Sequence, residues 1–373
     1  MKQVVVSVIN DLSTDQRVHK VCTTLHKMGF KVLLVGRKQR KSIPLSGRAY
    51  ATKRMFLFFE KGPFFYLEFQ LRLFLFLLFK KSDVLVSNDL DTLFPNYLIS
   101  KIKKSDLVYD THELFCEVPE LKNSPFKRNV WKKIEHFIFP KLTDVFTVND
   151  SIAKIYQQEY KIAIKVVRNI PLLSNQFQYK ETSKEQLAIP LNKKILVLQG
   201  AGINIDRGAE EMVEAMQFVN DAVLLIIGGG DVIDVLKEMT IQLSLKDKIL
   251  FVGKVPFEKL LQYTHHADIG LTLDKDTNIN YKYSLPNKLF DYIHAGVPVI
   301  ASDLIEIKNI IQTYQVGTCI NNHDPIHIAE KINTILSDTN TLLDWKKNTK
   351  IAAEKLNWEI EERQLIEVYS KFI

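Results

Sequence analysis

The residues best suited to chemistry lie in residues 284–300, where a loop precedes a short predicted helix and a buried strand. Pro286 and Asn287 supply a helix-starting proline and a capping side chain, and Gly296 supplies the stop. A helix that begins here directs several backbone N–H groups and the positive end of its dipole outward, with the Lys288 ammonium beside them. The segment therefore predicts a site for phosphate oxygens.

Asp291 follows one helical turn later, where its carboxylate can accept hydrogen bonds from ribose hydroxyls. Diphosphate at the helix tip and ribose on the first turn together predict a nucleotide-sugar site. An ordinary α/β loop with a well-capped helix is the alternative reading of the same residues.

A second candidate loop runs from Gln199 to Gly208, between a predicted strand and a predicted helix. Gly200 and Gly202 allow the backbone to approach a ligand closely, and Arg207 can donate two parallel hydrogen bonds to diphosphate oxygens. A surface arginine on a flexible turn is the alternative. The later glycines 228–230 fail the dinucleotide-binding pattern and predict a structural turn.

In the first half of the chain, His112 follows a buried strand and is predicted to project from its C-terminal end; a packing histidine is the alternative. Glu113 is a weaker candidate for ligand binding, or else caps the next segment. Asn10 and Asp11 follow the first strand and can contact a ligand, while nearby Asp15 is a candidate helix cap.

Asp89 belongs to an Asp-x-Asp sequence with Asp91, and Asp274 forms another with Asp276. An Asp-x-Asp sequence can bind a metal in other folds, but no cluster of histidine and cysteine suggests zinc. Asp89 is also a candidate cleft residue.

The chain has 373 residues, 46% of them hydrophobic and 25% charged, as in a globular protein large enough for two domains. Met1-Lys2 leads directly into an apolar run, so no signal peptide is predicted. The widely spaced Cys22, Cys116 and Cys319 predict reduced core thiols in the cytoplasm.

Charge is distributed unevenly along the chain. Residues 1–175 hold 29 Lys and Arg against 16 Asp and Glu, a net charge of +13, whereas the remainder holds 21 against 27, a net charge of −6. The basic half predicts an anionic partner such as membrane lipid, a phosphorylated carrier or nucleic acid.

Continuous apolar runs alternate with helical stretches, which is typical of parallel sheets covered on both faces. The predicted fold is α/β, with two doubly wound domains and ligands at the carboxyl ends of the strands. The predicted strands are 4–9, 31–35, 84–87, 107–109, 145–148, 164–167, 195–198, 222–227, 249–252, 268–271, 297–301 and 317–320.

Phe64–Phe79 is the most apolar stretch, within residues 55–79 that hold nine of the 22 phenylalanines. It contains Glu68, Gln70 and Arg72 and is too short to span a bilayer core of about 30 Å. A helix lying in the membrane interface and a helix buried in the domain both remain open.

Ala295–Ile300 and the helix before it resemble the donor-binding motif of retaining glycosyltransferases of the GT-B fold, glycosyltransferase family 4. The family carries a pair of glutamates ahead of this run. Asp291 stands at the second and Tyr283 at the first, a departure at a position that usually contacts the donor sugar. The resemblance extends over essentially the whole chain.

The resemblance implies an acceptor-side domain over residues 1–172, a linker over 173–192 and a nucleotide-sugar-binding domain over 193–356, with a helix over 357–373 packing back on the first. It implies catalysis without a metal or another cofactor, with His112 at the reacting centre. The donor-binding set is Gly200, Gly202, Arg207, Asn287, Lys288, Leu289 and Asp291, and the acceptor or cleft set is Asn10, Asp11, Asp89 and Glu113.

The predicted function is transfer of a sugar from a nucleotide-sugar to a saccharide or lipid-linked acceptor, in synthesis of a cell-surface polysaccharide or glycolipid. The expected location is the cytoplasm, with peripheral attachment to the inner face of the cell membrane as one possibility. A nucleotide-sugar 2-epimerase of the same architecture is the rival enzyme. A basic nucleic-acid-binding protein is disfavoured because no nucleic-acid module is recognisable.

Overall fold

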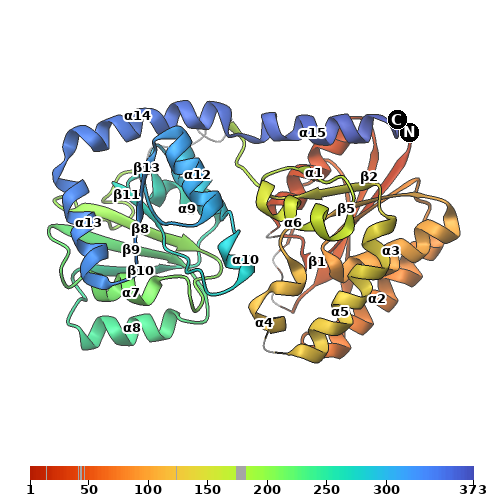
Figure 1. Ribbon diagram of the computed structural model, residues 1–373, viewed down its shortest axis with the longest axis horizontal. Helices are drawn as coiled ribbons and strands as arrows, with labels where there is room; N and C mark the ends of the chain where they lie inside the picture. Colours follow the sequence, from red (N-terminus) through yellow and green to blue (C-terminus); the bar gives the residue numbers. More distant parts are fainter. Residues whose placement is uncertain (14, 41, 43, 46, 123, 174–181) are drawn as a thin grey trace. The chain divides into compact units, whose positions relative to one another are not determined.

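The structure is a computed structural model that describes residues 1–13, 15–40, 42, 44–45, 47–122, 124–173 and 182–373. The chain forms two compact units (Figure 1). The N-terminal unit comprises Met1–Asn169 and Glu361–Ile373, and the C-terminal unit comprises Ile170–Ile360. Each unit is an α/β structure built on one parallel sheet.

The N-terminal unit contains a seven-stranded sheet in the order β3-β2-β1-β4-β5-β6-β7, with every neighbouring pair parallel. The first strand lies in the middle of the sheet, the next two extend the sheet to one edge, and the remaining four extend it to the other edge. This is the doubly wound topology. The strands are β1 (Gln3–Asp11), β2 (Lys31–Lys38), β3 (Ala51–Phe56), β4 (Val84–Asn88), β5 (Asp106–Asp110), β6 (Asp144–Thr147) and β7 (Lys165–Val166).

Helices connect these strands, as parallel neighbours require. Helix α2 packs Phe65, Phe69, Leu73 and Leu77 against a core that includes Ile99 of α3. The helices are α1 (Gln16–Lys27), α2 (Gly62–Phe79), α3 (Leu90–Lys103), α4 (Pro119–Lys122), α5 (Pro125–Ile138) and α6 (Asp150–Tyr160), with short 3₁₀ helices η1 (Phe115–Glu117) and η2 (Phe139–Lys141).

The last helix, α15 (Trp358–Ser370), brings residues 361–373 into the N-terminal unit. Thr24 Oγ1 donates to Glu362 Oε2 at 2.6 Å, and the Tyr369 ring stacks on Phe146 with centroids 6.3 Å apart. The C-terminal residues therefore complete the side of the unit formed by α1 and β6.

The C-terminal unit contains a six-stranded sheet in the order β10-β9-β8-β11-β12-β13, again parallel throughout. Its strands are β8 (Lys194–Gly200), β9 (Ala222–Gly228), β10 (Ile249–Gly253), β11 (Ile269–Thr272), β12 (Val299–Ser302) and β13 (Gly317–Ile320). Its helices are α7 (Ala209–Ala215), α8 (Ile233–Gln242), α9 (Phe257–His265), α10 (Ile279–Lys282), α11 (Asn287–His294), α12 (Ile305–Tyr314), α13 (Pro325–Ser337) and α14 (Thr339–Lys355).

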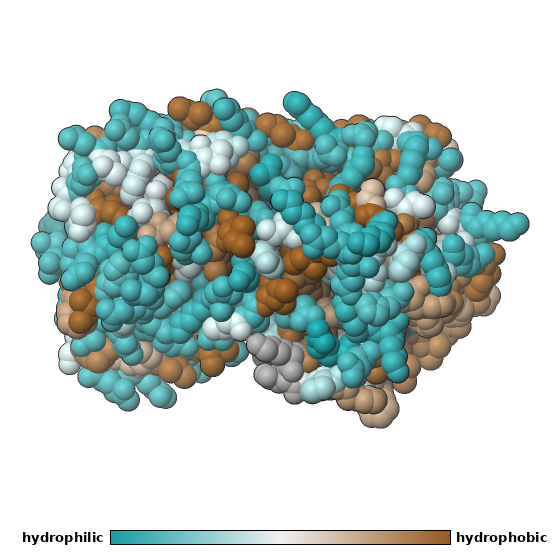
Figure 2. Space-filling model, viewed as in Figure 1, coloured by the Kyte–Doolittle hydropathy of each residue, from teal (hydrophilic) through white to brown (hydrophobic). Residues whose placement is uncertain are grey.

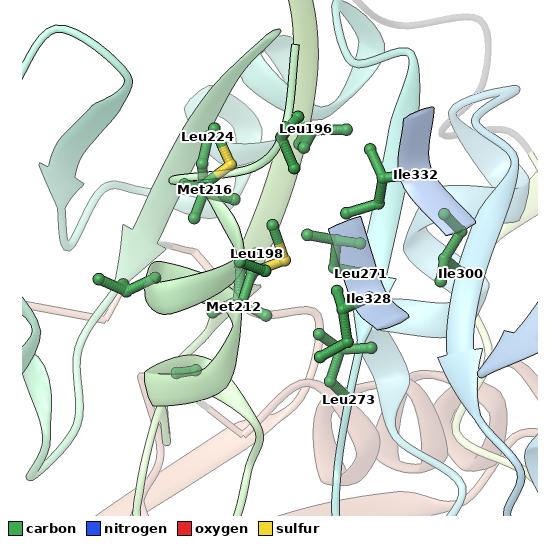
Figure 3. Close-up of a cluster of buried hydrophobic side chains, with 14 of the residues drawn as sticks. Leu196, Leu198, Met212, Met216, Leu224, Leu271, Leu273, Ile300, Ile328 and Ile332 are labelled. Atoms are coloured by element: carbon green, nitrogen blue, oxygen red, sulfur yellow. The ribbon is translucent and has the colours of Figure 1, made fainter. Parts of the chain in front are cut away.

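Successive side chains of a strand point to opposite faces of the sheet, and both faces of this sheet are covered. Leu196 and Leu198 of β8 enter one buried cluster with Met212 (Figure 3), whereas Ile195 and Val197 enter another. The sheet is thus packed on both sides, which explains the continuous apolar runs in its sequence.

The predicted fold class is confirmed by these two sheets, and the predicted strands lie within a few residues of the observed ones. Strand β3 was not predicted, because only Met55 in it is buried and its sequence has no apolar run. The predicted linker lies partly at residues 174–181, outside the described residues; residues 182–192 contain turns but no strand or helix.

The predicted start of helix α11 needs one correction. Pro286 is the N-cap, with φ −71° and ψ 139°, and Asn287 is the first helical residue; no side chain caps this end. Gly296, at φ +76°, follows the helix where the left-handed conformation ends it, as predicted.

Candidate functional site

Two cations of the predicted donor set act on one carboxylate in the C-terminal unit. Asp274 follows β11 and is fully buried. Arg207 Nη1 donates to Asp274 Oδ1 at 2.9 Å, and its guanidinium lies 4.2 Å from the centroid of the Tyr281 ring. Lys288, at the N-terminus of α11, acts electrostatically on the same carboxylate.

Charge balance explains how this group is held together. Burial raises the pKa of Asp274, but Lys288 and Arg207 outweigh that effect and hold the pKa of its carboxyl below its usual value. Burial lowers the pKa of Lys288, and Asp274 opposes that shift. Two basic side chains share this one carboxylate as a counter-charge, and Lys288 stands at a helix N-terminus, a combination that suits diphosphate oxygens.

Asp291 lies on the same helix as Lys288 and is buried. Gln199 at the end of β8 donates from Nε2 to Asp291 Oδ2 at 3.3 Å, and Gln199 Oε1 accepts from Thr264 at 2.6 Å. Asp291 is therefore fixed to the end of β8 through Gln199.

Asn287 is exposed at the first residue of α11, where its backbone can face a ligand. Leu289 is fully buried in the core, and its N–H donates to the Pro286 carbonyl at 3.1 Å. Neither the side chain nor the N–H group of Leu289 is therefore placed to contact a nucleotide-sugar.

The glycines of the loop after β8 have more space around them than the glycines of the 228–230 turn that packs on this loop. A Cβ on Gly200 or Gly202 would meet nothing closer than 3.6 Å. A Cβ on Gly228 would lie 1.8 Å from the Gly200 carbonyl oxygen, and one on Gly230 would lie 2.0 Å from that of Ile203. Close packing against the β8 loop therefore requires glycine at positions 228 and 230.

Gly208 connects the Arg207 loop to the end of β11. It has φ +69°, and a Cβ there would lie 2.2 Å from the Leu273 carbonyl oxygen, next to Asp274.

We expect Gly208→Ala to lower the free energy of unfolding by roughly 3 kcal/mol, from left-handed strain and overpacking combined. Gly253→Ala is the matched control, since Gly253 has φ +77° and open space around it, and should cost only about 1 kcal/mol. Urea unfolding measures both, and equal losses would contradict the close-packing argument.

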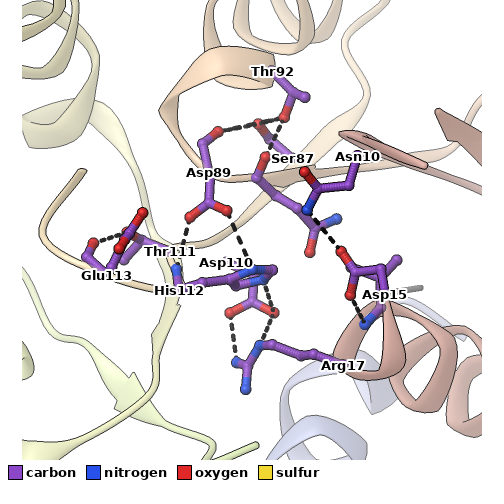
Figure 4. A network of polar contacts seen from close by, with 12 residues as sticks. Asn10, Asp15, Arg17, Ser87, Asp89, Thr92, Asp110, Thr111, His112 and Glu113 are labelled. Carbon is purple, nitrogen blue, oxygen red and sulfur yellow. Dashed lines mark hydrogen bonds and ion pairs between the residues drawn. The ribbon is translucent and has the colours of Figure 1, made fainter. Parts of the chain in front are cut away.

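In the N-terminal unit, His112 lies between two carboxylates (Figure 4). Its Nδ1 is 3.2 Å from Asp89 Oδ2, its backbone N–H donates to Asp89 Oδ1 at 2.8 Å, and its Nε2 is 3.6 Å from Asp110 Oδ2. Arg17 donates to both oxygens of Asp110, at 3.0 and 2.6 Å. Asp89 has φ +58°, a strained backbone for a non-glycine residue, and such strain concentrates at functional sites.

This arrangement makes His112 an imidazolium at neutral pH. Burial alone would lower the pKa of His112, but the Asp89 and Asp110 carboxylates outweigh it and raise the pKa to about 9. Burial also opposes ionisation of Asp110, yet Arg17 and His112 hold its pKa below its usual value. His112 is therefore equipped to donate a proton or to stabilise negative charge, rather than to accept a proton.

The remaining acceptor candidates have local partners. Asn10 Nδ2 donates to Asp15 Oδ2 at 3.2 Å, and Asp15 caps α1 through the Val18 N–H, as predicted. Asp11 is buried in an ion pair with Arg54 at 2.8 Å. The Glu113 carbonyl accepts from Thr111 Oγ1 at 2.8 Å, and Glu113 is not the N-cap of η1, which is Leu114.

Sequence reasoning missed the roles of Asp274 and Arg17. Asp274 was considered only as part of an Asp-x-Asp metal motif, although its place after a buried strand was a usable signal. Arg17 lies 93 residues from Asp110 in the sequence, and nothing local indicates the pairing.

One group of side chains in the described part of the chain is close enough to share a metal ion: Glu135, His136 and Glu159. Lys132 Nζ already lies 2.6 Å from Glu135 and 2.9 Å from Glu159, and so offsets one of their two negative charges. The group lies outside both candidate sites.

Residues 179–352 match the sequence model of the family described as Glycosyl transferases group 1. A D-inositol 3-phosphate glycosyltransferase of Xylanimonas cellulosilytica is 19% identical over 198 residues, which cover 50% of this chain and 45% of that protein. The chain thus spans about half the length of the curated relatives it matches.

Solved structures resemble the whole chain in fold. A sucrose-phosphate synthase from Thermosynechococcus elongatus has a TM-score of 0.82 at 16% identity, covering 100% of this chain and 99% of that one. The Anabaena protein HepE, solved in complex with UDP-glucose, has a TM-score of 0.76 at 14% identity, covering 100% of both chains. The shared architecture is the GT-B fold.

Proposed function

We propose that this chain, which contains a Glycosyl transferases group 1 domain in its C-terminal unit, transfers a sugar from a nucleotide-sugar donor to a saccharide or lipid-linked acceptor with retention of configuration. The observation that carries the proposal is the group of Arg207 and Lys288 around buried Asp274 at the N-terminus of α11. This group offers fixed positive charge and helix N–H groups to a diphosphate.

The reaction breaks the bond from the anomeric carbon to a diphosphate oxygen and forms a bond from that carbon to the acceptor oxygen on the same face. The acceptor proton passes to the departing diphosphate. Arg207 and Lys288 act by stabilising the negative charge that grows on that diphosphate as the bond breaks. Asp291 orients the ribose by accepting its hydroxyl hydrogen bonds.

His112 is the proposed catalytic residue of the N-terminal unit. As an imidazolium held by Asp89, it supplies a positive charge and a hydrogen-bond donor to the reacting sugar or its leaving group. Asp89 is a positioning residue, because it binds both the backbone and the ring of His112.

The proposed setting is the cytoplasmic side of a membrane, in synthesis of a polysaccharide or glycolipid. Cys22, Cys116 and Cys319 are free, which agrees with a reducing compartment. A lipid-linked acceptor would place the enzyme at a membrane surface.

A thermal-shift screen with UDP, GDP and ADP, each free and as a sugar conjugate, tests the donor site. A ligand at about a hundred times its Kd stabilises the native state by about 2.7 kcal/mol and raises the Tm by several degrees. NMR of the product made with the preferred donor and an acceptor then reports the anomeric configuration. No shift with any of these ligands would remove the donor-site assignment, and conversion of the nucleotide-sugar without an acceptor to its 2-epimer would favour the epimerase.

A further inference from the structure

We propose that the outward face of helix α2 docks on an anionic lipid bilayer. Helix α2 is the one helix in the described part of the chain that is long and apolar enough to cross a membrane by length and composition, yet only 22% of it is buried. Its inner stripe of Phe65, Phe69, Leu73 and Leu77 packs on the core of the N-terminal unit. Because that stripe is anchored, α2 can lie along a bilayer but cannot cross it without unfolding the unit.

Exposed apolar residues run along the outer side of α2 from one end to the other. Phe64, Leu67, Leu71, Leu75 and Phe79 are 46–85% exposed, and their spacing of three and four residues places them on one side of the helix. Figure 2 shows hydrophobic side chains gathered at the edge of the N-terminal unit where α2 lies. Monomeric soluble proteins rarely expose such a continuous apolar surface unless it binds something.

The charged residues within α2 neutralise each other. Arg72 Nε donates to Glu68 Oε1 at 2.8 Å, and Glu68 also accepts from the N–H groups of Phe58 and Phe59. These bonds hold the preceding loop beside the helix. Phe58 and Phe59 of that loop, and Phe56 at the end of β3, are 49–71% exposed. We call these three residues and the five exposed residues of α2 the α2 face.

Basic side chains lie at both ends of the α2 face. Lys61 precedes the helix, and Lys80 and Lys81 follow it; Lys61 and Lys81 are exposed and Lys80 is half-buried. Ammonium groups flanking an apolar strip suit a bilayer, since the strip enters the acyl boundary while the lysines reach anionic headgroups.

A second copy of the chain is a poorer occupant of the same face. In a two-fold symmetric dimer through antiparallel α2 helices, Lys61 of each copy would approach Lys80 and Lys81 of the other. Like charges would then meet at both ends of the contact, which disfavours it. The lysines favour a bilayer with negative headgroups.

Sedimentation of the full chain with vesicles tests the proposal without any nucleotide, so the outcome is independent of the proposed sugar transfer. We use phosphatidylcholine vesicles, alone and mixed with phosphatidylglycerol, at low and high salt. Binding should require phosphatidylglycerol and weaken with salt. Leu71→Glu should weaken binding roughly tenfold or more, and the double change Lys80→Gln and Lys81→Gln about fivefold per lysine.

Matched controls lie in the C-terminal unit. Ile351→Glu changes an exposed apolar residue of α14 with 54% exposure, against 57% for Leu71, and Lys350→Gln with Lys355→Gln removes two exposed lysines. The controls should bind as the wild type does, and all variants should melt at the wild-type temperature because the changed side chains are on the surface.

Equal binding of the Leu71→Glu variant and the wild type would overturn the proposal, as would failure of the wild type to sediment at low salt. A doubled mass in light scattering that Leu71→Glu abolishes, without vesicle binding, would assign the α2 face to a second copy instead.

Discussion

Replacing His112 with glutamine should lower turnover by about two to three orders of magnitude while nucleoside diphosphate affinity changes less than about twofold. Glutamine keeps a hydrogen-bonding side chain of similar length but removes the positive charge that Asp89 and Asp110 maintain. Steady-state kinetics and calorimetry measure the two quantities. His26→Gln, at an exposed histidine of α1, is the control and should keep wild-type turnover. Wild-type turnover in the His112 variant would return this residue to a packing role.

The same residue predicts a pH dependence. The folded-state pKa of His112, about 9, lies above the ordinary histidine value of 6.5, so its protonation stabilises the fold fully below about pH 6.5. That contribution is lost as the pH rises through about 9, and turnover should fall over the same range. Asp89→Asn removes the largest favourable charge and should move the alkaline fall in turnover to lower pH. An unchanged profile in Asp89→Asn would contradict its positioning role.

Replacing Lys288 with glutamine should weaken nucleoside diphosphate binding about ten- to a hundredfold, because a charge-assisted contact contributes roughly 1.5–3 kcal/mol. This variant leaves the 2.9 Å pair of Arg207 and Asp274 in place, so the domain should stay folded. Arg207→Ala should show a similar loss of affinity together with lower stability, since buried Asp274 loses its direct partner. Isothermal calorimetry and thermal unfolding separate the two effects.

Lys282→Gln is the matched control for Lys288→Gln. It removes the same charge from the same domain, but Lys282 is a surface residue 3.5 Å from Asp276 and should not affect the diphosphate. Asp291→Ala tests the ribose contact and should also weaken binding. Wild-type affinity in folded Lys288→Gln and Asp291→Ala proteins would move the donor site elsewhere.

The fold could be predicted largely because strands that are buried on both faces consist mainly of apolar residues, and such runs can be recognised in the sequence. Strand β9 is buried along nearly its whole length, and so its residues 222–227 form an uninterrupted apolar run. Strand β3 lies at the edge of its sheet with a polar, mostly exposed sequence, and so it carried no such signal.

The site residues that could be predicted are those placed by a local element such as the start of a helix. The residues that could not be predicted are those held by contacts with side chains far away in the sequence. Lys288 and Asp291 follow from the helix start at residue 287. The anchor Asp274 and the Arg17–Asp110 pair arise from contacts between residues 67 and 93 positions apart, which no single segment encodes. Leu289 was included because it lies within the motif, but its side chain is buried in the core. A residue within a binding motif therefore need not contact the ligand.

The discontinuous N-terminal unit has a consequence for biosynthesis. The C-terminal unit is one contiguous stretch, Ile170–Ile360, whereas the N-terminal unit takes residues from both ends of the sequence. The N-terminal unit, although translated first, lacks Tyr369 for its stack on Phe146 and Glu362 for its bond to Thr24 until residues 361–373 are made. Most of its residues therefore wait through the synthesis of the whole C-terminal unit, and during that time chaperones would meet an unfinished surface on α1 and β6.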